Sequence, residues 1–172
     1  MLRSSGLRAA FSPRIRQLAS GSGSFERRAA AHWTADRIAW LSNGRDDPLQ
    51  PDKPGVAPLL RVLGLLNADG SLSPDKLKKY RQLNAMYDAI EHAVGGTLGG
   101  SARRPQRPLR YVDLCSGSSS HIALLLAFAA RHRWGRLAHI LAVDADPTRV
   151  KAAEQRAALL GDDLLTAFLS SA

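Results

Sequence analysis

Two acidic residues, each at the end of a short apolar run, are the side chains best suited to ligand chemistry. The run 109–114 contains Asp113 and leads into a loop of small residues, C-S-G-S-S-S, at 115–120. A second run ends in Asp144, about thirty residues further on. The small loop lets backbone N–H groups at the next helix start approach a ligand, where negative charge gains about 0.3–1 kcal/mol. A carboxylate in the position of Asp144 accepts hydrogen bonds from two ribose hydroxyls, so these residues predict an adenosine-containing ligand.

The residues after the first run separate two classes of adenosine cofactor. A dinucleotide site requires G-x-G-x-x-G directly after the strand, and the sequence lacks this motif. The segment D-L-C-S-G-S-S instead resembles motif I of the class I S-adenosylmethionine-dependent methyltransferases, D/E-x-G-x-G-x-G. The resemblance implies that Asp113 helps to place the methionine amine, that Gly117 is the middle glycine and that Asp144 binds the ribose. Cys115 and Ser119 replace the other two glycines, and a left-handed backbone at Ser119 would cost about 1–2 kcal/mol.

The segment that follows the second run supports the same resemblance. Asp146 has the character of a helix N-cap and Pro147 that of a first helical residue. Apolar residues then recur at helical spacing until Gly161. The string V-D-A-D-P-x-x-V-x-x-A-x-x-x-A-x-x-L-G is similar to the unit of strand two and its helix in these methyltransferases. The alternative interpretation is an ordinary βαβ unit with an incidental serine loop.

Together these motifs predict an α/β fold with an incomplete Rossmann-like methyltransferase sheet, containing strands one and two with room for a third, within residues 109–172. The family's strand order is 3-2-1-4-5-7-6, and only eleven residues follow Gly161, so we expect the catalytic and substrate half to be missing. The methyl acceptor and the catalytic residues are not predicted. The resemblance implies S-adenosylmethionine as the cofactor, bound by Asp113, Cys115, Ser116, Gly117, Ser118, Ser119, Asp144 and Ala145.

Without a fourth strand, one side of the strand 109–114 is unpaired. An unpaired apolar parallel strand is a template for another chain. Three outcomes are open: another chain completes the sheet, the N-terminal helices cover it, or the sequence is a shortened form of a longer enzyme. A competing function is therefore that of a catalytically inactive, methyltransferase-like assembly or structural subunit of a mitochondrial complex.

The mitochondrial location is predicted from residues 1–24. This segment contains four arginines and several apolar residues, and no acid occurs before Glu26, as in a mitochondrial presequence, with cleavage expected after Leu18. A disordered basic tail is the alternative. The formal charge of +9 depends partly on this segment, because 20 basic and 15 acidic residues remain without the first 25, giving +5. No segment approaches the roughly 18 apolar residues of a membrane span.

Residues 25–96 are predicted to be a helical region and 97–108 a linker rich in glycine, proline and arginine. A helix is expected over 25–41, the form of 56–66 is left open, and Ser73-Pro74 begins a helix. Its single apolar stripe consists of Leu77, Tyr80, Leu83, Tyr87, Ile90 and Val94. Its segment K-K-Y-R-Q-L-N, residues 78–84, is similar to a helix that packs over the cofactor site in some methyltransferases. A solvated basic face is the favoured alternative.

The other reactive side chains support few further predictions. Cys115 is the only cysteine, so no internal disulfide can form, and a small residue in a tight loop is its expected role. His121, His132 and His139 lack the spacing of metal ligands, and no metal site is predicted. Several arginines could contact RNA phosphates, but with only Tyr111 and Trp134 as aromatic neighbours a solvated surface is favoured. These arginines are Arg103, Arg104, Arg107, Arg110, Arg131, Arg133 and Arg136.

Overall fold

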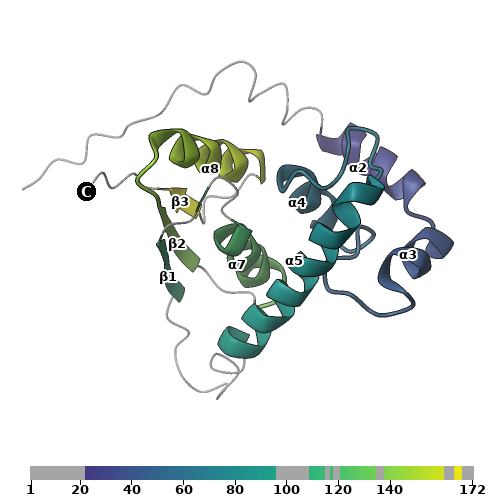
Figure 1. Ribbon diagram of the computed structural model, residues 1–172, viewed down its shortest axis with the longest axis horizontal. Coiled ribbons are helices and arrows are strands. Elements are labelled where there is room, and N and C mark those ends of the chain that lie inside the picture. The colour runs from purple at the N-terminus through teal and green to yellow at the C-terminus, as the bar shows by residue number, and fades with distance from the viewer. Residues whose placement is uncertain are drawn as a thin grey trace, which may run out of the picture.

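The computed structural model describes residues 22–95, 109–114, 117, 121–134, 138–160 and 165–167. The fold is mixed α/β and mostly helical (Figure 1). The predicted cleavage site, most of the predicted presequence and the linker lie outside the described residues, and a helix already begins at Ser22. The helices are α2 (Ser22–His32), α3 (Ala35–Ser42), α4 (Val56–Val62), α5 (Leu77–Ile90), α7 (His121–His132) and α8 (Pro147–Leu160).

The strands β1 (Leu109–Leu114), β2 (Ala138–Val143) and β3 (Leu165–Ala167) form a parallel sheet in the order β1-β2-β3. Asp113 pairs with Ala142, and Ile140 pairs with Leu165. The short β3 is the third strand that the sequence left open. Helix α7 connects β1 to β2, and α8 connects β2 to β3. Because the strands are parallel, β1 and β2 end at the same edge of the sheet, which brings Asp113 and Asp144 to neighbouring strand ends.

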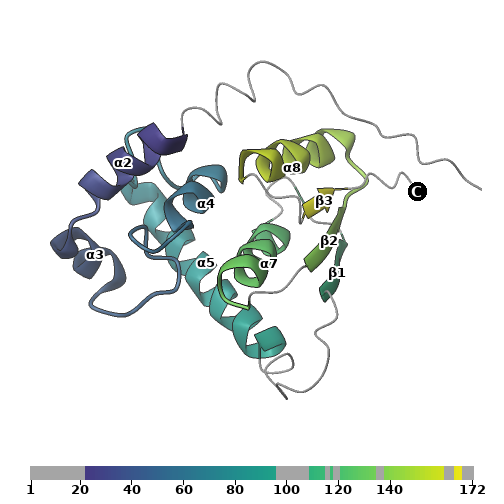
Figure 2. The ribbon, with the colours of Figure 1, turned by 180° about the vertical axis from the view of Figure 1, so that it is seen from behind.

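The described helices all lie on one side of the sheet, as both views show (Figures 1 and 2). Helices α7 and α8 pack directly on the strands, and α4 and α5 pack on α8 and α7 in turn. The side chains of β1 follow this arrangement. Asp113 is buried on the covered side, whereas Val112 and Leu114 are 52% and 70% exposed. The described helices therefore leave the outer face of β1 uncovered, and the outcome in which the N-terminal helices cover its unpaired edge stays a prediction.

Helix α7 lies at the centre of the core. Its residues 122–130, I-A-L-L-L-A-F-A-A, contain no polar side chain, and every residue from Ala123 to Ala130 is buried. A helix that is apolar all round must be covered on all sides. The sheet covers one side, and α5 covers another, where the rings of Tyr87 and Phe128 meet edge to face at 6.2 Å. The helical region and the sheet thus share one core.

Helix α5 confirms the apolar stripe that the sequence predicted. Tyr80, Leu83 and Tyr87 are buried in the shared core, and the other members of the stripe are partly buried against it. A 3₁₀ turn at Pro74–Lys76 precedes the helix, and a π-helical turn at Glu91–Gly95 follows it. The sequence left the form of the segment 56–66 open. This segment contains α4, and Gly64, which follows the C-cap residue of α4, has a left-handed backbone.

The single helix expected over 25–41 is wrong, because the chain forms α2 and α3 with a break at Trp33 and Thr34. Trp33 is buried there, and its indole Nε1 donates a hydrogen bond of 2.8 Å to the carbonyl oxygen of Gly70. Thr34 has an extended backbone and occupies the N-cap position of α3. A contact with a residue 37 positions away thus fixes the break.

The loop at Gly70 packs tightly on α2. Gly70 has φ +90°, and a Cβ atom there would lie 2.6 Å from the Cα atom of Ala29. Gly64 has a similar φ of +76° but open space around the same position. The two glycines therefore share a left-handed backbone but differ in steric surroundings.

We predict that Gly64→Ala lowers the free energy of unfolding by about 1–2 kcal/mol, the cost of a left-handed backbone at alanine. Gly70→Ala should lower it further, because the backbone of α2 must also shift. Urea unfolding of the two variants measures the difference. Equal losses would contradict the tight packing of Gly70 on α2.

Candidate functional site

Asp144 follows β2 directly, and its carboxylate contacts the loop after β1. Only 6% of the residue is exposed. Its Oδ2 accepts a hydrogen bond of 2.8 Å from the backbone N–H of Gly117, and its Oδ1 accepts one of 3.0 Å from the N–H of Asp146. These two donors hold the pKa of Asp144 below its usual value. The carboxylate is therefore ionised at neutral pH, as ribose binding would require.

The start of α8 places a second carboxylate and a cation beside Asp144. Asp146 Oδ1 accepts hydrogen bonds from the backbone N–H and the hydroxyl of Thr148, at 2.8 and 2.6 Å, which confirms the predicted N-cap. These bonds lower the pKa of Asp146. Arg149 lies 3.7 Å from Asp144 Oδ1 and 3.4 Å from Asp146 Oδ2. Sequence reasoning missed Arg149, although its position three residues after Asp146 placed it in the same helical turn.

Asp113 occupies a different environment at the end of β1. Burial raises the pKa of its carboxyl, and a hydrogen bond from the backbone N–H of Ala123 opposes that effect. Ala123 belongs to the first turn of α7, where a helix favours negative charge. Asp113 thus links the end of β1 to the start of α7, a role that sequence reasoning did not assign to it.

The structure brings only part of the predicted site into view. Gly117 and Asp144 are in direct contact, and Asp113 lies at the end of the neighbouring strand. Ala145 is exposed beside Asp144. The remaining predicted residues, Cys115, Ser116, Ser118 and Ser119, lie outside the described residues.

His121 begins α7, four positions after Gly117, and is half-buried. Burial lowers the pKa of its imidazole to about 4, and the charges of Lys79 and Arg156 add to this effect. The imidazole is therefore neutral at pH 7. Lys79 lies in the first turn of α5, within the segment 78–84. Helix α5 packs on α7.

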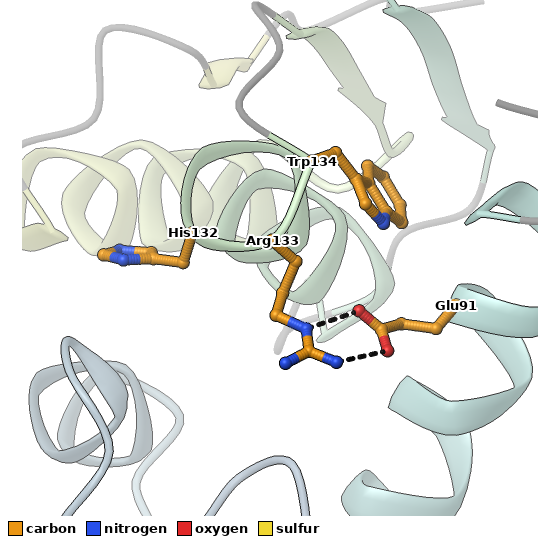
Figure 3. Close-up of a pocket in the computed structure, with 4 residues that line it drawn as sticks. All are labelled: Glu91, His132, Arg133 and Trp134. Carbon is orange, nitrogen blue, oxygen red and sulfur yellow. Dashed lines mark hydrogen bonds and ion pairs between the residues drawn. The ribbon is translucent and has the colours of Figure 1, made fainter. Parts of the chain in front are cut away.

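A pocket of about 420 Å³ lies at the opposite end of α7 from the Gly117 loop (Figure 3). It is lined by Glu91, His132, Arg133 and Trp134. Arg133 donates to both carboxylate oxygens of Glu91, at 3.1 and 3.3 Å, and the Tyr87 hydroxyl donates to the same carboxylate at 3.3 Å. The pair joins the end of α7 to the π-helical turn after α5. It also engages one of the arginines that the sequence offered for RNA, a role that stays a prediction.

Neither a metal cluster nor a membrane-spanning helix is present in the part of the chain that the structure describes. The described residues contain no group of three or more His, Cys, Asp or Glu side chains placed to hold a metal ion. None of the helices within them has the length and apolar character needed to cross a bilayer. Comparison of the chain with models of known protein families, with curated proteins and with solved structures gave no match.

The two strand-end acids should respond to pH with opposite signs. The lowered pKa of Asp144 stabilises the fold above the usual aspartate pKa of about 3.9, and this contribution disappears as the pH falls through the lowered value. The raised pKa of Asp113 has the opposite effect. Asp113 does not destabilise the fold below about pH 3.9, and its destabilising effect is largest once the pH exceeds the raised pKa.

We therefore predict that Asp144→Asn destabilises the chain at pH 7, whereas Asp113→Asn is neutral or stabilising, since the amide oxygen can still accept from the Ala123 N–H. Both effects should shrink toward pH 2.5. Urea unfolding at a series of pH values measures them. A stabilising Asp144→Asn substitution at pH 7 would show that the two N–H bonds do not hold the ionised carboxylate.

Proposed function

We propose that the chain binds S-adenosylmethionine at the carboxyl ends of β1 and β2 and is the cofactor-binding part of a Rossmann-like methyltransferase. The observation that carries the proposal is the buried carboxylate of Asp144, whose Oδ2 accepts a hydrogen bond from the Gly117 N–H in the loop after β1. The parallel order of the strands, with a helix after each of β1 and β2, supports it. The proposed cofactor-binding residues are Asp113, Cys115, Ser116, Gly117, Ser118, Ser119, Asp144 and Ala145.

The geometry of Asp144 fits a ribose diol. A carboxylate offers about four lone-pair sites, and one hydrogen bond from a backbone N–H occupies each oxygen. Two acceptor positions are thus left for ribose hydroxyls, although Arg149 lies close to one oxygen. Asp113, at the end of β1, would contact the amine of the methionine part of the cofactor. Because Asp113 is buried, the amine would have to reach it at the end of the strand.

The chemistry proposed is methyl transfer to an acceptor that is not identified. The cofactor supplies an electrophilic methyl group on its sulfonium. The protein's contribution to such a transfer is mainly the alignment of the acceptor with that methyl group. We place the activity in the mitochondrial matrix from residues 1–24, whose first 21 residues lie outside those described.

Calorimetric titration with S-adenosylmethionine, and separately with S-adenosylhomocysteine, tests the cofactor site. We predict micromolar binding that is lost in Asp144→Ala, because the ribose hydroxyls lose their acceptor. Glu154→Ala is the matched control, since it removes the same charge from an exposed position of α8. A folded wild-type chain that binds neither compound at millimolar concentration would contradict the proposal.

The exposed outer face of β1 favours a second candidate, an assembly or structural subunit without catalysis. Parallel sheets are almost always covered on both faces, yet Val112 and Leu114 are exposed and β1 pairs only with β2 among the described strands. Such an edge and face could dock another protein chain that completes the sheet. RNA binding through exposed Arg110 is a weaker possibility within the same role.

The scaffold candidate predicts that the purified chain associates through β1 when its partner is absent. Leu114→Lys should then abolish concentration-dependent association in light scattering coupled to size exclusion. Trp40→Lys, a change at an exposed apolar residue of α3, should leave the association intact. A monodisperse wild-type monomer that binds the cofactor would count against the scaffold role.

A further inference from the structure

We propose that Gly117 is a positioning residue whose backbone N–H fixes the carboxylate of Asp144, and that a left-handed backbone is what requires glycine there. The ligand part of this inference rests on the proposed function. The internal part concerns only the contact between Gly117 and Asp144 and can be tested without a ligand.

The backbone of Gly117 supports this role. Its φ is +69°, a conformation that residues with a Cβ atom rarely adopt. Among the described residues, none comes within 4 Å of a Cβ built on Gly117. Within that part of the chain, the backbone conformation restricts this position more than the available space does.

The hydrogen bonds at Asp144 show what the conformation achieves. The N–H of Gly117 reaches Oδ2 from the loop after β1, and the N–H of Asp146 reaches Oδ1 from the start of α8. The carboxylate is thus held from two sides by backbone groups of two segments. Arg149 adds a longer contact from an exposed side chain. Donors on both oxygens orient the carboxylate plane before any ligand arrives.

This arrangement changes the role expected for the loop. In the motif that the sequence resembles, small residues let backbone N–H groups approach the ligand, and this is the role that the sequence predicted for the loop. The N–H of Gly117 is instead directed to Asp144 at 2.8 Å. While this bond persists, Gly117 contributes to the cofactor site through the ribose-binding acid.

Two substitutions of Gly117 distinguish the need for a left-handed backbone from the need for a ligand to approach that backbone closely. Asparagine tolerates the left-handed region better than alanine does. The chain itself provides an example in Asn43, which ends α3 with φ 52° and ψ 43°. Gly117→Asn should therefore keep the N–H in place, whereas Gly117→Ala should displace it. Both side chains would obstruct a ligand that has to approach the backbone.

The first measurement is the pKa of Asp144 in the ligand-free chain. NMR of the side-chain carboxyl during a pH titration gives this value. We expect a pKa below the usual value in the wild type and in Gly117→Asn, and a pKa closer to the usual value in Gly117→Ala. An unchanged pKa in Gly117→Ala, or an equal rise in both variants, would overturn the inference.

The second measurement is calorimetric titration of the same three chains with S-adenosylhomocysteine. We expect Gly117→Ala to weaken binding by about fivefold to thirtyfold, the factor that corresponds to the cost of the left-handed backbone, and Gly117→Asn to weaken it less. A different result is that both variants lose binding while the pKa of Asp144 stays unchanged in Gly117→Asn. That result would mean that glycine is needed so that the ligand can approach the backbone closely, and it would overturn the inference. A wild type that does not bind would contradict the proposed function, and the pKa measurement would still decide the role of Gly117.

Discussion

The structure depends on the burial of α7. Its residues 122–130 are apolar on every side of the helix, so no orientation of α7 leaves a face suited to water. The sheet alone can cover only one side. Helices α4 and α5 therefore belong to the same core as the strands, although the sequence places them before a linker. The helical region is thus part of the scaffold that holds the strand ends.

This constraint determines the position of the candidate site. Because α7 is fixed between the sheet and α5, its first turn lies against the end of β1, where Asp113 accepts the Ala123 N–H. The next strand, β2, ends beside it, and Asp144 follows β2 directly. The same residue type then has two environments. Burial dominates at Asp113 and raises its pKa, whereas backbone donors dominate at Asp144 and lower its pKa.

Local patterns predicted the elements that depend on local chemistry. The stripe of α5, the N-cap at Asp146 and the parallel strands with connecting helices could all be recognised from spacing and residue type. The features that were missed depend on contacts between distant segments. The break between α2 and α3 requires the carbonyl of Gly70, and the bond between Gly117 and Asp144 joins positions 27 residues apart. Neither leaves a periodic signal in the sequence.

The proposed adenosine cofactor binds where Gly117 meets Asp144. This site is tested by titrating the ¹⁵N-labelled chain with S-adenosylhomocysteine while its amide resonances are recorded by NMR. We expect saturable shifts that are largest at the amides of Gly117, Ala145 and Asp146, because these N–H groups belong to the residues around the carboxylate proposed to bind the ribose. A folded chain in which these amides do not move at millimolar ligand, or in which the shifts gather at the pocket of Glu91 and Trp134, would contradict the proposed site.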